Sequence, residues 1–239
     1  MSVIRESMDL YKSKFLTILL IGLTIIIPTL FLYTFVVNYT TFPLRVFFIP
    51  IWPDMVKLFF TMIVFPFIQI PFVSMALQYA RIGDVKVSRV YGDILKYGFS
   101  IYVISILSSV LITIGSLLLL IPGLVLMIFF MGIPFVAVVD DMTGWRGVKQ
   151  SFAFAKTHFI QLMGWLLLFV LFDFVLSFIL SFIAIYAANS FLVVNLSLTL
   201  GTILTLPVFV FGITFQYLDW IGDNPVNDLA EDFGEVSFS

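Results

Sequence analysis

The segment from Gly98 to Val139 contains no charged residue, and this feature constrains the fold more than any other. A helix that crosses a bilayer needs about 20 apolar residues, so the segment is too long for one crossing and fits two. Ile121-Pro122-Gly123 combines helix-breaking residues near its middle, where we expect a tight turn. The sequence therefore predicts a transmembrane hairpin here.

The rest of the chain has the same character, with long apolar runs separated by short charged segments. Of 239 residues, 62% are hydrophobic and 11% are charged, whereas soluble domains have about 45–50% and about 25%. We therefore predict an all-α, polytopic integral membrane helical bundle with six transmembrane helices. The expected spans are Phe15–Val37, Leu58–Ala80, Gly98–Ile121, Leu124–Val139, Gln161–Ala187 and Phe191–Leu218.

The cations lie predominantly on one side of this topology. Ten of the twelve Lys and Arg residues precede span one or lie in the loops after spans two and four, and only Arg45 and Lys57 lie on the other side. Cationic loops remain in the cytoplasm. We therefore expect a multi-pass protein of the cell membrane with both termini cytoplasmic and with the charged start, Met1 to Lys14, retained.

Three similar units recur along residues 1–218, with approximate bounds 1–80, 81–141 and 142–218. Each begins with an apolar stripe beside cations, typical of an interfacial amphipathic helix, and continues into a hairpin. The second helix of each hairpin contains a proline, at Pro71, Pro134 and Pro207. The pattern predicts a single transmembrane domain built from three hairpin repeats.

One stretch resembles a known family. Leu120-Ile121-Pro122-Gly123 is followed by Val139-Asp140-Asp141-Met142-Thr143-Gly144 and by Gly147-Val148-Lys149-Gln150-Ser151. This pattern resembles the YciC-like bacterial membrane proteins and the membrane domain of some glycerophosphodiester phosphodiesterases. The resemblance implies a six-helix membrane domain of largely undefined activity, and it carries over no catalytic residue.

Asp173 is the most unusual polar residue, because it lies near the middle of span five. An ionised carboxylate at that depth costs about 2.5–3.5 kcal/mol, so we expect Asp173 to be paired, hydrated or protonated. Polar stripes on other spans could meet it. They would form either a proton- or ion-linked pathway or ordinary interhelical hydrogen bonds. The other candidates for this site are Ser177, Ser105, Ser109, Asn195, Thr199 and Gln69.

Cations beside the spans are candidate contacts for anionic lipid headgroups, although topology determination explains the same charges. These candidates are Lys12, Lys14, Arg89, Lys96, Arg146, Lys149 and Lys156. The cytoplasmic tail, residues 219–239, carries six carboxylates and no cation. It fits either a disordered tail or a short helix that docks on a protein partner.

The remaining titratable residues give no persuasive catalytic set. Asp140 and Asp141 lie where span four ends and fit helix capping or pairing with nearby cations, while the single histidine, His158, fits interfacial hydrogen bonding or pH sensing. There is no cysteine. We therefore expect no enzyme activity, metal, cofactor or nucleic-acid partner. A non-catalytic accessory or membrane-organising protein that binds lipid or a partner is favoured over a transporter that uses Asp173.

Overall fold

The computed structural model describes residues 2–46, 51–188 and 190–222, and apart from short turns these residues are helical. Six helical segments in the described ranges are long and apolar enough to cross a membrane, so this is a multi-pass helical membrane protein. The elements are α1 (Ser2–Ser13), α2 (Phe15–Ile21), the π-helix η1 (Gly22–Ile26), α3 (Ile27–Val46), α4 (Trp52–Ile82), α5 (Val87–Leu118), α6 (Leu120–Met131), α7 (Ile133–Val139), α8 (Gly144–Ala188) and α9 (Phe191–Ile221).

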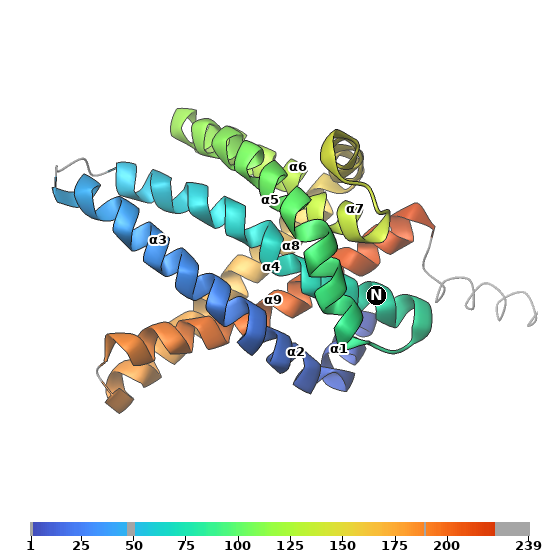
Figure 1. The fold of residues 1–239 in the computed structure, drawn as a ribbon, viewed down its shortest axis with the longest axis horizontal. Helices are drawn as coiled ribbons and strands as arrows, with labels where there is room; N and C mark the ends of the chain where they lie inside the picture. The colour runs from blue at the N-terminus through green and yellow to red at the C-terminus, as the bar shows by residue number, and fades with distance from the viewer. Residues whose placement is uncertain (1, 47–50, 189, 223–239) are drawn as a thin grey trace, which may run out of the picture.

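The six spans form three hairpins that diverge from a common end. Figure 1 shows the α3/α4 and α8/α9 hairpins pointing to the left and separating, while α5/α6 reaches the top of the view. The other ends of the helices gather around α1 and α7. The predicted fold class is confirmed, and each of the six expected spans overlaps one of the six membrane-crossing segments. The third, fifth and sixth expected spans extend beyond their segments, to Ile121, to Ala187 and back to Phe191.

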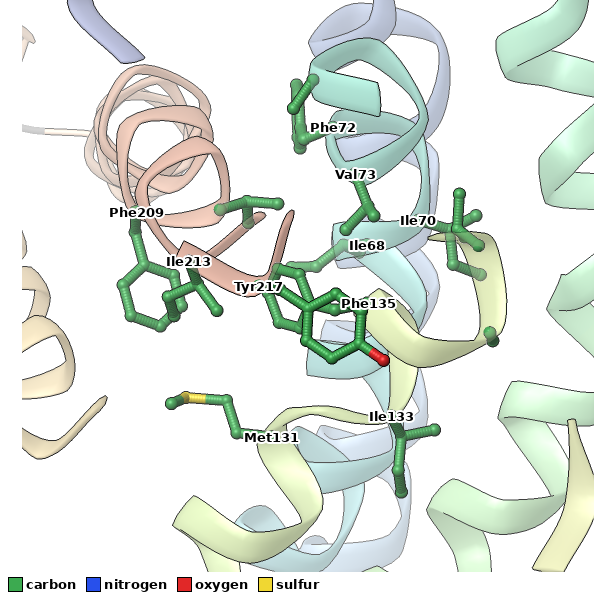
Figure 2. Packing of buried hydrophobic residues seen from close by; sticks show 14 of the residues in the cluster. Ile68, Ile70, Phe72, Val73, Met131, Ile133, Phe135, Phe209, Ile213 and Tyr217 are labelled. Carbon is green, nitrogen blue, oxygen red and sulfur yellow. The ribbon is translucent and has the colours of Figure 1, made fainter. Parts of the chain in front are cut away.

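The core lies at the common end rather than at the hairpin tips. The second half of α4, all of α7 and the second half of α9 are almost entirely buried. Figure 2 shows this packing, with Phe72, Phe135 and Tyr217 among the side chains between α4, α7 and α9. By contrast, Leu118 and Leu120 at one tip and Phe178 on α8 are exposed, as expected for side chains that face lipid.

The turn of the second hairpin differs in position from the prediction. The backbone breaks at Leu119, which is extended with φ −157° and ψ 140°, and α6 begins at Leu120. Pro122 therefore lies in the first turn of α6, where a helix needs no N–H donor and tolerates proline. Gly123 faces α5, because a Cβ at this position would lie 2.0 Å from the Ser116 Oγ. The proline and glycine shape the start of the returning helix instead of forming the break.

The predicted amphipathic helices are only partly separate from the spans. α1 ends at a kink, where Lys14 has φ −118° and ψ 24°, and α8 contains the same kink at His158, with φ −116° and ψ 24°. The corresponding stretch of α5 runs into its span without a break. α4 and α9 also end alike, at Gly83 and Gly222 with φ 73° and 72°. The first and third predicted units thus share backbone features that the second lacks.

Candidate functional site

Asp173 lies half-buried on α8 and faces α9. Its carboxylate accepts a hydrogen bond of 2.9 Å from the hydroxyl of Thr205, which is itself buried. A cavity of about 170 Å³ lies beside this pair and is lined by α3, α4, α8 and α9. Across the cavity, the hydroxyls of Tyr33 and Thr61 are hydrogen-bonded to each other at 2.9 Å. Two separate polar pairs therefore border one small cavity.

The walls between these pairs are apolar. Phe65, Ile68, Phe169 and Leu206 line the same cavity, and Phe169 packs on the ring of Phe209 with centroids 4.7 Å apart. A chain of hydrogen-bonding groups across the membrane would need polar atoms or water at each step. The described geometry around Asp173 fits an interhelical hydrogen bond beside a mainly apolar void.

The predicted polar residues do not all meet at Asp173. Ser105 and Ser109 are buried on α5 and do not line its cavity. Gln69 is fully buried on α4 without a hydrogen-bond partner for its amide atoms, and it too is absent from the cavity lining. The Thr199 hydroxyl donates to the backbone carbonyl of Asn195 within α9. The stripe on α5 is thus separate from the group formed by α8 and α9.

Ser177 lies one turn after Asp173 on α8 and is half-buried. A Cβ on Gly201 of α9 would lie 3.8 Å from the Ser177 Oγ, so the two helices approach each other closely there. Sequence reasoning did not identify the partner of Asp173, Thr205, or the opposite pair, Tyr33 and Thr61. Thr202, which lies on α9 one helical turn before Leu206, also lines the cavity.

A larger hollow lies on the other face of the α3/α4 hairpin. It has a volume of about 510 Å³ and is bounded by α3, α4 and Tyr102 of α5. Its lining is mainly apolar and includes Leu32, Val36 and Phe67, with Tyr33 shared between this hollow and the Asp173 cavity. We call it the α3–α5 groove. Its residues lie within the segments that are long and apolar enough to cross a membrane.

Charged and polar contacts join the segments at the common end. Lys14 Nζ lies 2.5 Å from Asp84 Oδ1, and Lys96 Nζ lies 2.9 Å from Asp141 Oδ1. The hydrogen bond from Lys14 lowers the pKa of the Asp84 carboxyl, and hydrogen bonds from Lys96 and Tyr97 lower that of Asp141. Both carboxylates are therefore ionised at neutral pH.

Three further hydrogen bonds lie at this end. Ser74 donates to Asp93 at 2.5 Å, which links α4 to α5. The Gln78 carbonyl accepts the backbone N–H of Lys86, the residue before α5. The buried Tyr217 donates to Asp140, so α9 is joined to the end of α7. The sequence predicted helix capping or pairing with nearby cations for Asp140. It did not indicate the hydrogen bond with Tyr217.

The predicted headgroup cations differ in exposure. Six of the seven are exposed, whereas Lys14 is half-buried in its pair with Asp84. Residues 223–239, which form most of the acidic tail, lie outside the described residues. Among the residues that are described, no group of three or more His, Asp or Glu side chains is arranged to hold a metal ion.

Comparisons with protein-family models, with curated proteins and with solved structures find no match to this chain.

Proposed function

We propose that this protein is a non-catalytic, multi-pass protein of the cell membrane that binds lipid between its hairpins and has an accessory or membrane-organising role. The observation that carries the proposal is the α3–α5 groove, an apolar hollow of about 510 Å³ within the membrane-crossing region. Membership in the YciC-like family, with both termini cytoplasmic, is part of the same proposal. The cation distribution and the ion pairs at the common end support that orientation.

Lipid hydrocarbon is the solvent that we expect around the groove. Water has few hydrogen-bond partners along Leu32, Val36 and Phe67, and an empty hollow of this size would forfeit van der Waals contacts. A lipid acyl chain supplies those contacts. An acyl chain gains no hydrophobic free energy when it moves from bilayer hydrocarbon to a similarly apolar wall. Selectivity among lipids therefore comes from the shape of the groove and from its hydroxyls, such as those of Thr29 and Tyr102.

Filling the groove tests this proposal. Leu32 is 62% exposed and lines the groove, while Leu168 is equally exposed on α8 and lies outside it. We expect Leu32→Trp to reduce crosslinking of a photoactivatable acyl-chain lipid to α3 and α4 several-fold, because the indole occupies the lipid's space. Leu168→Trp serves as the matched control. Equal crosslinking of the wild type and both variants would contradict lipid binding in the groove.

A transporter is the second candidate, and Asp173 beside a cavity is the observation that favours it. Asp173→Asn keeps an acceptor for Thr205 and removes the ionisable carboxyl group, whereas Thr205→Val keeps the carboxyl group and removes the hydrogen bond. If the role of Asp173 is only structural, Thr205→Val should lower the free energy of unfolding by about 1–3 kcal/mol, and Asp173→Asn should lower it by less. In that case neither variant changes flux. Ion or solute uptake in proteoliposomes that is abolished by Asp173→Asn would establish transport instead.

A further inference from the structure

A second pocket lies at the common end, away from the α3–α5 groove. It has a volume of about 410 Å³ and lies between α1, α8 and α9. Its polar and aromatic lining consists of His158, Gln161, Trp165, Gln216, Asp219 and Trp220, and two apolar residues of α1 bound the remaining side. We call it the interfacial pocket, because it lies at the interface between α8, near its kink at His158, and the end of α9.

The local sequence explains how these side chains converge. His158 is the kink residue of α8, and Gln161 and Trp165 follow it at helical spacing. Gln216 and Trp220 likewise lie four residues apart on α9. Gly212, one turn before Gln216, leaves room for the indole of Trp165, because a Cβ there would lie 2.5 Å from the ring. The kink and this glycine together place two indoles beside one pocket.

The polar lining of the pocket presents hydrogen-bond acceptors. Gln216 donates its amide N–H to the Gln161 carbonyl, and the Gln216 Oε1 is buried without a partner. The Nδ1 atom of His158 is also buried without a partner, and in the tautomer protonated at Nε2 it accepts a hydrogen bond. Asp219 adds a carboxylate. Among the described residues, no Lys or Arg lines the pocket, so this lining favours a cation over an anion.

We propose that the interfacial pocket binds a primary ammonium group, such as that of an ethanolamine phospholipid headgroup. An ammonium ion interacts favourably with indole faces and a carboxylate, and its N–H groups match the unpartnered acceptors of Gln216 and His158. A quaternary ammonium carries no N–H, so choline leaves those acceptors unpaired. Indoles at the membrane–water interface are also at headgroup depth.

This inference extends the proposed lipid binding to a headgroup at a separate surface. The proposal of acyl-chain binding and the proposal of headgroup binding can be contradicted independently. Leu32→Trp fills only the α3–α5 groove and leaves the interfacial pocket unchanged. Selectivity between headgroups reports on the pocket, whereas crosslinking of acyl chains along α3 and α4 reports on the groove.

The test is native mass spectrometry of the full chain with phosphatidylethanolamine, phosphatidylcholine or phosphatidylglycerol of identical acyl chains. We expect preferential retention of phosphatidylethanolamine. Asp219→Asn and Trp220→Leu should each weaken that retention about fivefold or more, in line with loss of a charge-assisted or cation–π contact. Trp145→Leu is the control, because Trp145 is 72% exposed on α8 and does not line the pocket. Each variant is first shown to unfold at the wild-type temperature.

Gln161→Ala, at an exposed position, supplies an independent variant if Trp220→Leu does not fold. Competition by free ethanolamine, but not by choline, would assign the site to a soluble amine rather than to a lipid, with the same residues responsible. Equal retention of phosphatidylethanolamine and phosphatidylcholine by the wild type would overturn the proposal. Preference for phosphatidylglycerol, or selectivity that persists in Asp219→Asn, would also overturn it.

Discussion

Replacing Gly123 by alanine should destabilise the protein by about 1–3 kcal/mol, because the α5/α6 hairpin leaves no space for a side chain there. A Cβ at Gly123 would lie 2.0 Å from the Ser116 Oγ and 2.8 Å from the Ser116 Cα and backbone nitrogen. A hydroxyl can rotate away, but the backbone of α5 cannot move without disturbing its packing on α4. We expect the loss in the free energy of unfolding, measured by denaturant titration in mixed micelles.

The origin of that loss can be tested with a second substitution. Ser116→Gly removes the closest atom and leaves the backbone atoms at 2.8 Å, so the double variant should recover only part of the stability. Gly92→Ala on α5 is the control, because no atom lies within 4 Å of its added Cβ. It should gain about 0.5–1 kcal/mol from reduced backbone entropy. A Gly123→Ala variant as stable as the wild type would mean that α6 does not approach α5 this closely.

The same glycine illustrates what the sequence could and could not predict. Hydropathy identifies all six spans, because bilayer thickness imposes a length that is visible along one dimension. The Ile121-Pro122-Gly123 motif correctly indicated a hairpin, yet the break lies at Leu119. Whether a glycine breaks a helix or admits a neighbouring one depends on which helix packs against it. That information is absent from local sequence.

The polar candidates were predicted less well for a related reason. Periodicity places Asp173 on one face of a helix, but it does not specify the partner helix or its axial register. Thr205 is 32 residues away in the chain and meets Asp173, whereas Ser105 and Ser109 lie on a separate buried face of α5. By contrast, the kinks at Lys14 and His158 occur at corresponding places in the first and third predicted units, whereas α5 of the second unit continues without one.

The second large effect is expected from Tyr217→Phe, which should lower the free energy of unfolding by about 1–3 kcal/mol. Tyr217 is fully buried and donates its hydroxyl proton to Asp140. Its ring also packs edge-on against Phe154, with centroids 4.9 Å apart, and Figure 2 shows it among the core side chains. Phenylalanine keeps the ring and removes only the donor. The substitution therefore isolates the hydrogen bond that joins α9 to the end of α7.

A double-mutant cycle separates this bond from a general effect of removing a buried hydroxyl. If Tyr217 and Asp140 interact, Asp140→Asn and Tyr217→Phe should be non-additive by about 0.5–3 kcal/mol. Tyr39→Phe, at a position that is 75% exposed, should change stability little. Strict additivity in the cycle would contradict a Tyr217–Asp140 bond. A coupled result would instead establish that this hydrogen bond helps to hold the second hairpin to the third at the common end, beside the bond from the Ser151 hydroxyl on α8 to the Phe129 carbonyl on α6.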